Sequence, residues 1–401
     1  MSARTVGAAL IAAVAAMASG AAPIPPATAD TAAGSHSRTG HPQNGHSRTG
    51  HPETGHSQTQ AAIEAAVRDG VPGVVVQTHD RRGAWSGTAG VGSPATGRER
   101  APQDRYRVGS ITKTFVATVL LQLEAEGSLS LDDTVEHWLP GVVRGQGHDG
   151  RRITLRQLLN HTSGIYNYSD DKGFQDKLFG DGFFQHRYDT WTPRQLVAVA
   201  MGHRPDFAPG TDWNYSNTNF ILAGMVVERA TGRPYGSEIE RRILRPLRLH
   251  ATSLPGTDPR VPRSRSRAYS TLSEDPKAKI HDVTEFNPSA AGSAGEMISD
   301  SADLQRFYRT LLKGGLLPPK QLKEMTTTVR MNPQRPQYRY GLGLMQQKLS
   351  CGKDVWGHGG GIHGSTSEAV TTRDASHSLA MNFNGDWAGD AVPVVEAEFC
   401  G

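Results

Sequence analysis

Apolar and polar positions divide the chain into three stretches of different character. Behind Arg4, residues 6–18 form an alanine-rich apolar run that is too short to span a bilayer, and Ala-Thr-Ala at 27–29 supplies the small residues of a signal-peptidase site. Residues 1–29 therefore predict a signal peptide, and the mature protein is expected outside the cell. A retained N-terminal anchor is the less favoured alternative.

Residues 30–59 are predicted to be a disordered linker rich in histidine and glycine. The run His-Ser-Arg-Thr-Gly-His-Pro recurs after ten residues, at 36–42 and 46–52. Because the repeat holds no apolar residue, it cannot build a core. Metal capture or attachment to a cell-wall polymer is the functional alternative, but a solvated tether is favoured and no metal site is assigned.

From residue 60 to residue 401 the pattern predicts one globular domain. Strand-like runs occur at 73–78, 83–90, 340–346, 354–357, 365–371 and 379–383. Helical spacing of apolar residues occurs behind Lys113 and at 61–69, 155–159, 193–201, 219–231, 237–244, 300–312 and 388–399. Strands at both ends predict an α+β fold, with an antiparallel sheet from the N- and C-terminal segments flanked by helices, beside a mostly helical lobe. The site is expected between the two.

Charge and cysteine content narrow the class of protein. The 43 basic and 39 acidic side chains are interleaved and give a net charge of +4, so the clustered charge of a nucleic-acid-binding surface is missing. No later run has the length of a membrane span, and none is expected. The two cysteines, Cys351 and Cys400, predict one disulfide bond in an exported chain, with two buried thiols as the less favoured alternative.

A serine and a lysine stand three residues apart where an apolar helix begins. Ser110 and Lys113 share one helix face, because positions i and i+3 are neighbours on a helix. A lysine inside an apolar helix becomes less basic, since burial disfavours its charge, and can then accept the proton of a serine hydroxyl. The pair predicts a serine nucleophile with a lysine base. Ser-x-x-Lys also occurs at 169–172, in a polar loop, and at 350–353, beside the predicted disulfide, and we interpret both as chance.

Two later segments carry side chains that suit the same chemistry. Tyr215 and Asn217 precede an apolar helix; a phenol near a lysine can relay a proton, and an amide can bond both a lysine and a substrate carbonyl. Helix capping is the alternative explanation. In the run Trp-Gly-His-Gly-Gly-Gly-Ile-His-Gly at 356–364, His358 stands among glycines that would let a ligand approach a strand edge. A glycine-rich turn explains that run equally well.

Other hydrolase signatures are missing from the sequence. No Gly-x-Ser-x-Gly, His-Glu-x-x-His or paired Cys-x-x-Cys occurs. An α/β-hydrolase and a zinc enzyme are therefore disfavoured, and no metal or other cofactor is expected.

Taken in order, Ser-x-x-Lys, Tyr-x-Asn and His-x-Gly on a late strand resemble the penicillin-recognising serine hydrolases. These include D-alanyl-D-alanine carboxypeptidases, class C β-lactamases, and related esterases and D-aminopeptidases. The chain is most similar to the secreted actinobacterial D-alanyl-D-alanine carboxypeptidases, over nearly all of residues 60–401. The shared stretches lie at 107–110, 121–123, 161–164, 215–220, 340–344, 350–352 and 399–401.

The resemblance implies roles for the candidate residues. Ser110 would be the acylated nucleophile, Lys113 its proton acceptor, and Tyr215 the shuttle that brings the proton to the leaving group. Asn217 would orient Lys113 and the substrate carbonyl. The backbone N–H groups of Ser110 and Gly361 would form the oxyanion hole.

The resemblance also covers the late strand and the cysteines. His358 takes the place of the lysine or histidine that begins the family's Lys/His-Thr-Gly strand. The disulfide bond of the family supports the pairing of Cys351 with Cys400.

Departures from the family concern the substrate. Met345 replaces an arginine that would hold a substrate carboxylate, and Gly359 and Gly361 replace two threonines. Together with Gly360, these are the candidate substrate-binding positions. The acylation residues are kept while the carboxylate clamp is lost, so the preference is expected to have shifted from free C-terminal D-alanine, unless Arg339 or a nearby lysine replaces the clamp.

The sequence thus predicts a secreted serine hydrolase of the D-alanyl-D-alanine carboxypeptidase type that forms an acyl-enzyme and acts on D-amino-acid-containing peptides, amides or esters. A class C-like β-lactamase or esterase, and a non-catalytic penicillin- or wall-binding protein, are the alternatives. The expected partners are a peptidoglycan-type peptide or a small D-amino-acid derivative, with β-lactams as inhibitors. The protein is expected to be a monomer.

Overall fold

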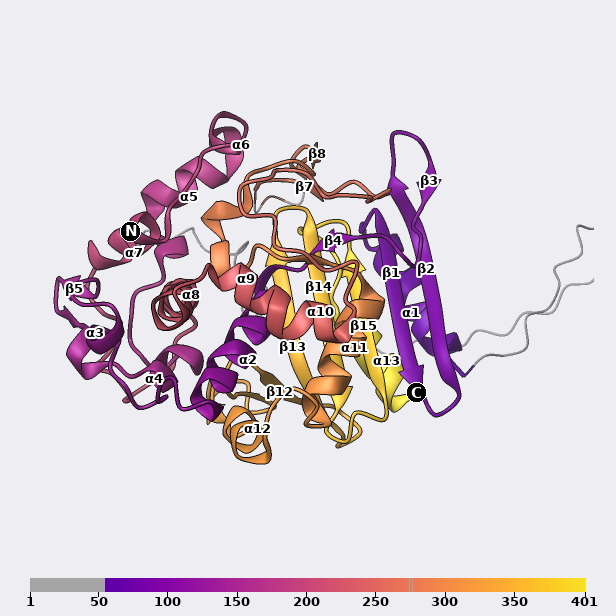
Figure 1. Cartoon of the computed structure of the whole chain (residues 1–401). Helices are drawn as coiled ribbons and strands as arrows, with labels where there is room; N and C mark the ends of the chain where they lie inside the picture. Colours follow the sequence, from indigo (N-terminus) through magenta and orange to yellow (C-terminus); the bar gives the residue numbers. More distant parts are fainter. Residues whose placement is uncertain (1–54, 274, 276) are drawn as a thin grey trace, which may run out of the picture.

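The described part of the chain is an antiparallel sheet with helices on both faces and a helical lobe at one side (Figure 1). It comes from a computed structural model that describes residues 55–273, 275 and 277–401. The predicted signal peptide, and the predicted linker as far as residue 54, lie outside the described residues. The predicted α+β architecture is confirmed.

The central sheet joins the two ends of the chain. Among the described residues its nine strands run in the order β10-β11-β12-β13-β14-β15-β1-β2-β3, and neighbouring strands are antiparallel. Because β1 pairs with β15, the indigo N-terminal strands lie beside the yellow C-terminal ones (Figure 1). The strands are β1 (Gly73–Asp80), β2 (Gly83–Ser93), β3 (Arg98–Glu99), β10 (Val329–Arg330), β11 (Tyr338–Tyr340), β12 (Met345–Lys348), β13 (Asp354–Ile362), β14 (Ser365–Thr372) and β15 (Ser378–Phe383).

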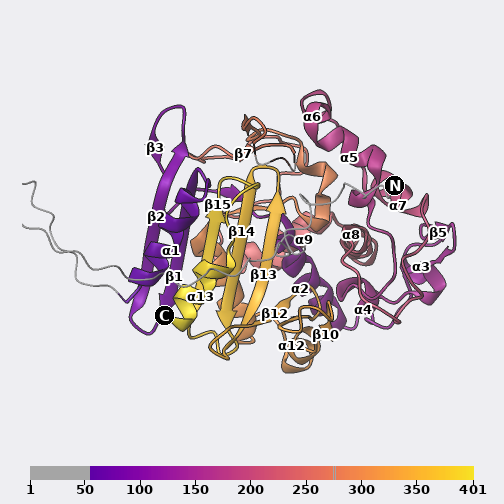
Figure 2. The ribbon, with the colours of Figure 1, turned by 180° about the vertical axis from the view of Figure 1, so that it is seen from behind.

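Helices cover both faces of the sheet. α1 (Ser57–Arg68) and α13 (Val392–Cys400) lie side by side on the face seen in Figure 2, where their apolar side chains form one core cluster with those of β1 and β15. α11 (Ser301–Leu312) covers the other face and packs on α2 (Thr112–Ala125) through stacked rings of Phe115 and Phe307, 3.7 Å apart. α2 is therefore buried between the sheet layer and the lobe.

The helical lobe follows α2 in the chain and packs against it through α8. Its helices are α3 (Val135–Trp138), α4 (Leu155–Leu159), α5 (Lys172–Leu178), α6 (Gly180–His186), α7 (Pro193–Met201), α8 (Asn217–Thr231), α9 (Tyr235–Ile239) and α10 (Arg245–Leu247). α12 (Pro319–Met325) packs at the other end of α2. Short strand pairs join β4 (Tyr106–Arg107) to β9 (Ile298–Ser299), β5 (Arg144–Gly145) to β6 (His148–Asp149), and β7 (Tyr269–Ser270) to β8 (His281–Asp282).

The strand predicted at 340–346 is interrupted, and this prediction is wrong. Residues 341–344 form a turn in which the Gly341 backbone N–H donates to Leu344 O at 2.7 Å. The side chains of Leu342 and Leu344 are buried in the core, so the apolar alternation continues through the turn. Two short strands, β11 and β12, therefore replace one long strand.

The glycine-rich run at 356–364 is mostly strand. β13 pairs with β14 from Val355 to Ile362, and the chain turns only at Gly364, whose φ is +71°. The turn interpretation of this run is wrong, because backbone pairing along β14 holds the glycines extended.

α1 begins at Ser57, four residues earlier than predicted, because its first turn is attached to α13. The carboxylate of Glu398 accepts a hydrogen bond from Thr59 Oγ1 at 2.7 Å and lies 3.0 Å from His56 Nδ1. Burial alone would raise the pKa of Glu398, but hydrogen bonds from His377, Thr59 and His56 hold it below its usual value. Residues 57–59, at the end of the predicted linker, therefore belong to the folded domain.

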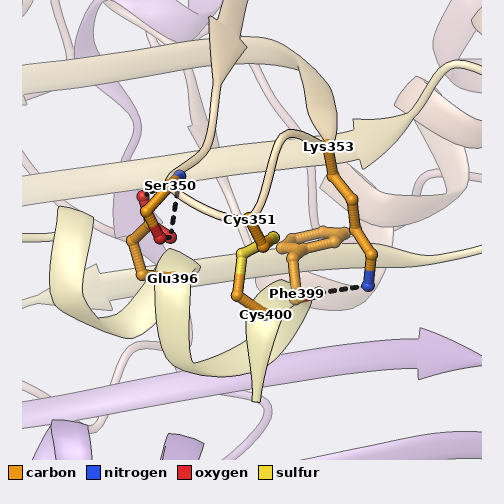
Figure 3. The surroundings of a disulfide bond; sticks show 6 residues. All are labelled: Ser350, Cys351, Lys353, Glu396, Phe399 and Cys400. Atoms are coloured by element: carbon orange, nitrogen blue, oxygen red, sulfur yellow. Dashed lines mark hydrogen bonds between the residues drawn. A yellow bond between two sulfur atoms is a disulfide. The ribbon is translucent and has the colours of Figure 1, made fainter.

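The predicted disulfide bond is present between Cys351, in the β12–β13 turn, and Cys400, at the end of α13 (Figure 3). Beside it, Lys353 Nζ donates to the backbone oxygen of Phe399 at 2.5 Å. On the other side, Ser350 Oγ donates to the carboxylate of Glu396 at 2.7 Å. These contacts attach the C-terminal helix to the hairpin that carries β13.

Replacing both cysteines with serine is expected to lower the free energy of unfolding by about 2–4 kcal/mol, because the bond closes a long loop, with a sequence separation of 49. Chemical denaturation followed by circular dichroism measures this loss. Ser350→Ala, which removes an exposed hydrogen bond beside the disulfide, is the control and should cost less than about 1.5 kcal/mol. An unchanged denaturation midpoint in the double variant would show that the hydrogen bonds alone hold the helix.

Candidate active site

Ser110 lies in a short 3-10 turn, η1 (Gly109–Ile111), that leads directly into α2. Gly109 has a φ of +53°, and a Cβ at this position would lie 2.7 Å from Gly361 O. Glycine therefore provides both the backbone conformation and the close approach to β13. Ser110 is buried, and its hydroxyl oxygen accepts a hydrogen bond from Lys113 Nζ at 2.9 Å. The predicted serine and lysine are in contact.

Lys113 is completely buried, with 0% of its surface exposed. Its Nζ also donates to Asn217 Oδ1 at 2.8 Å and to the backbone oxygen of Ala294 at 2.6 Å. Burial without a compensating carboxylate holds the pKa of Lys113 well below its ordinary value. The site therefore favours a neutral amine beside the Ser110 hydroxyl.

Tyr215 approaches this pair from the loop before α8. Lys113 Nζ lies 4.9 Å from the centroid of the Tyr215 ring. The buried phenol oxygen has no hydrogen-bond partner of standard geometry among the described residues. Burial raises the pKa of Tyr215, and an interaction with Ser110 offsets part of the rise. The phenol therefore keeps its proton near Ser110.

An aromatic cluster lies behind Tyr215. Tyr340 and His358 share a hydrogen bond of 2.8 Å between the phenol oxygen and Nε2. His161 packs on the rings of Tyr215 and Tyr340, at centroid distances of 4.3 and 4.8 Å. Burial, together with the charge of Lys113, lowers the pKa of His358 to about 3. A neutral His358 therefore orients Tyr340, and its hydrogen bonds within the described part of the chain do not include Ser110.

Sequence analysis missed two members of this cluster. His161 and Tyr340 are in the stretches at 161–164 and 340–344 that resemble the carboxypeptidases. That resemblance was the only signal for them, because neither residue belongs to the Ser-x-x-Lys, Tyr-x-Asn or His-x-Gly patterns.

β13 presents a free edge to the nucleophile. β12 pairs only with residues 354–357 of β13, so residues 358–362 have a strand partner on the β14 side alone within the described sheet. A Cβ at Gly360 would lie 1.9 Å from Val108 O and 3.0 Å from Ser110 N. Glycine thus lets the edge approach the nucleophile turn, where strand N–H groups can bind an extended substrate or a developing oxyanion.

A narrow cavity opens beside the nucleophile. Ser110, Asn217 and Gly361 line its reacting end. Apolar side chains line the rest: Tyr168, Leu178, Phe183, Trp191, Phe286 and Ile362. Because Phe183 of α6 packs with Phe286 and Ile362, α6 connects the lobe with the edge of the sheet above the site. A larger cavity, of about 840 Å³, lies within the lobe and does not include Ser110.

The candidate substrate-binding residues Met345, Gly359 and Gly360 do not line the Ser110 cavity. Met345 packs with Tyr340 in a small core cluster. A Cβ at Gly359 would lie 2.7 Å from the Glu368 carboxylate, while the next residue, Gly360, faces the nucleophile turn. Of these three, only Gly360 contacts the catalytic layer, and it does so through its backbone.

No arginine replaces the missing carboxylate clamp within the described site. Arg339 donates its Nε–H to Thr328 Oγ1 at 2.8 Å and is not among the residues that line the cavity. Arg187 is the only arginine or lysine of the cavity wall, and its guanidinium lies over the rings of Phe184 and Tyr188, 5.6 and 4.7 Å from their centroids. The acyl pocket is therefore mainly apolar.

Comparison with known proteins identifies relatives of this structure. A crystal structure of a D-stereospecific amidohydrolase from Streptomyces sp. is 66% identical, with a TM-score of 0.83 over 86% of this chain and 99% of that chain. D-amino acid amidase from Ochrobactrum anthropi SV3, complexed with L-phenylalanine amide, is 26% identical, with a TM-score of 0.74 over 86% of this chain and 98% of that chain.

Curated relatives are more distant. Penicillin-binding protein 4 from Amycolatopsis lactamdurans is 29% identical over 57% of this chain and 56% of that protein, so the chain spans little more than half the length of this relative. A family model described as Beta-lactamase matches residues 59–393. Because that match extends over most of the chain, the chain belongs to the beta-lactamase family, within the serine hydrolase superfamily that also contains the penicillin-binding proteins.

Proposed function

We propose that the protein is an exported amidohydrolase that cleaves amides, peptides or esters of D-amino acids through an acyl-enzyme on Ser110. The observation that carries this proposal is the buried contact of 2.9 Å between Lys113 Nζ and Ser110 Oγ at the end of an apolar cavity. The 66% identical structure, described as a D-stereospecific amidohydrolase, supports the substrate class.

Acylation follows from the protonation states that the site favours. Neutral Lys113 accepts the Ser110 hydroxyl proton as Oγ attacks the carbonyl carbon of the scissile bond. The backbone N–H groups of Ser110 and Gly361 bind the oxyanion. Tyr215 donates its phenol proton to the leaving amine or alcohol and recovers a proton from Lys113. The carbon–nitrogen or carbon–oxygen bond then breaks and leaves the acyl group on Ser110.

Deacylation uses the same groups in the opposite direction. A water molecule attacks the ester carbonyl while Lys113 and Tyr215 accept its proton, and the Ser110 oxygen leaves and is reprotonated. The products are the free acid and the original enzyme. Fast deacylation distinguishes such a hydrolase from a penicillin-binding protein that stays acylated.

The cavity wall favours an apolar acyl group over a free carboxylate. Met345 has replaced the expected arginine, and Arg187, the one cation of the described cavity wall, lies over aromatic rings. A substrate whose C-terminus is an amide or ester needs no positive partner there. A D-amino-acid amide or a blocked D-peptide therefore fits better than a D-alanyl-D-alanine end.

Export is the remaining part of the proposal. The predicted signal peptide at 1–29 supports it, and the disulfide bond between Cys351 and Cys400 is typical of an oxidising compartment. Within the described residues, no helix combines the length and apolar character of a membrane-spanning segment.

Ser110→Ala is expected to abolish the acyl-enzyme and to lower kcat/KM by at least about 10³-fold, because it removes the nucleophile. Intact-mass spectrometry of protein quenched during turnover of a D-phenylalanine ester detects the adduct in the wild type. Ser350→Ala, in the Ser-x-x-Lys run beside the disulfide, should be acylated normally. An adduct that survives Ser110→Ala would contradict the assignment of the nucleophile.

The pH dependence of kcat/KM is expected to report the buried lysine. The rate should rise with pH as Lys113 loses its proton, because only the neutral amine accepts the serine proton. Since burial lowers the pKa of Lys113, this rise should be complete well below the range near pH 10.4 in which an exposed lysine titrates. Lys113→Arg, which stays charged, should be inactive at every pH. A wild-type profile that follows an ordinary lysine would exclude Lys113 as the base.

D-phenylalanine amide is expected to be hydrolysed with a kcat/KM about 10- to 100-fold above that of a peptide ending in D-alanyl-D-alanine, because one charge-assisted contact to the carboxylate is missing. Chromatographic product assays measure both rates, and L-phenylalanine amide is the stereochemical control. Equal rates for the two D-substrates would instead support a carboxypeptidase. Rapid turnover of penicillin would identify a β-lactamase, and no reaction with any of them would indicate a binding protein.

A further inference from the structure

Asn217 contacts a different side chain through each end of its amide. Its Oδ1 accepts a hydrogen bond from Lys113 Nζ at 2.8 Å, and its Nδ2 donates to Ser169 Oγ at 3.1 Å. Asn217 is 2% exposed and Ser169 is 3% exposed, so solvent does not compete for these bonds. Ser169 is thus connected to the base through one buried amide.

The orientation of that amide decides where the lone pair of a neutral lysine points. A neutral amine has two N–H donors and one lone pair. Asn217 Oδ1 and Ala294 O can only accept, so they take the two N–H groups of Lys113. The lone pair then faces the third neighbour, the Ser110 hydroxyl at 2.9 Å, which has a proton to donate.

A flipped amide would change this arrangement. The two ends of an asparagine side chain have nearly the same shape, so packing alone does not choose between them. If Nδ2 faced Lys113, its N–H would donate to the amine lone pair and compete with Ser110. Ser169 Oγ favours the observed orientation, because it accepts from Nδ2.

We propose that Ser169 is a positioning residue for the reaction proposed above, because its hydroxyl fixes the Asn217 amide so that the lone pair of Lys113 is directed at Ser110. The inference rests on the proposed serine hydrolase function and assigns Ser169 no contact with the substrate.

Ser169 is itself held rigidly. It lies in the 3-10 turn η3 (Tyr168–Asp170), and Gln175 Nε2 donates to its backbone oxygen at 3.1 Å. The preceding residue, Tyr168, donates its backbone N–H to Thr218 Oγ1 at 3.0 Å and its hydroxyl to Ala290 O at 2.7 Å. The turn is therefore attached to the first turn of α8, next to Asn217, and to the segment that leads to Ala294.

The second Ser-x-x-Lys run thus has a role that its pattern does not describe. Lys172, its lysine, is exposed and pairs with Asp176 at 2.7 Å, so the pair is a chance match as interpreted from the sequence. Its serine nevertheless lies behind the first pair, which places Ser169 in the active site by tertiary contact alone.

The test measures the reactivity of Ser110 without an amide substrate. A fluorophosphonate probe forms a bond from Ser110 Oγ to phosphorus, fluoride leaves, and Lys113 accepts the proton, so the labelling rate reports the base directly. Ser169→Ala should be labelled about three- to tenfold more slowly than the wild type. Its labelling should also begin at lower pH, because an amide that has turned its donor to Lys113 no longer accepts from the ammonium. Ser169→Thr, which keeps the hydroxyl, should restore both the rate and the pH profile.

Ser163→Ala is the matched control. Ser163 is also buried, and its hydroxyl donates to Asn219 Oδ1 at 2.6 Å on the same helix α8, but it does not contact Asn217. A merely structural loss should affect both alanine variants alike, with no shift of the pH profile. Equal labelling rates and profiles for Ser169→Ala and the wild type would overturn the proposal. A labelled wild type that hydrolyses no D-amino-acid derivative would refute the proposed substrates while leaving the Ser169 comparison valid, and an unlabelled Ser110 would refute both.

Discussion

Burial of Lys113 without a counter-charge is the constraint on which the rest of the site depends. An ammonium group in an apolar core is disfavoured unless its charge is compensated. This site supplies only neutral acceptors, from Asn217 and Ala294. These satisfy the N–H groups of the amine without stabilising its charge strongly, so the lysine is kept as a base rather than as half of an ion pair.

That constraint explains the arrangement of the layers. α2 must be covered on all sides to keep water from Lys113, and the fold covers it with α11 and the sheet on one side and with α8 on the other. The sheet in turn requires both ends of the chain, because β1 pairs with β15. The disulfide bond and the Glu398 cluster attach α13, and with it the C-terminus, to strands and helices far away in sequence.

Chemistry and substrate choice are separated in this structure. The acylating groups lie where η1, α8 and the edge of β13 meet, and glycines at 109 and 360 permit that approach because any side chain would collide with backbone. The acyl group, in contrast, faces aromatic residues contributed by the lobe and by α6. A family that shares the first arrangement can therefore change its substrates by changing the second, as the replacement of an expected arginine by Met345 illustrates.

The sequence by itself determined the α+β class, most strands and helices, the pairing of the two cysteines and the contact between Ser110 and Lys113. These features depend on spacing within a few residues or on the presence of only two thiols, and a linear pattern records both. Tertiary structure alone decided the turn at 341–344, because its buried leucines imitate a strand. It also decided the contacts of Lys113 with Asn217 and Ala294, which are 104 and 181 residues away in the chain, and the place of Ser169 behind them. The direction of an amide or a lone pair is set by whatever the fold packs against it, and no local periodicity carries that information.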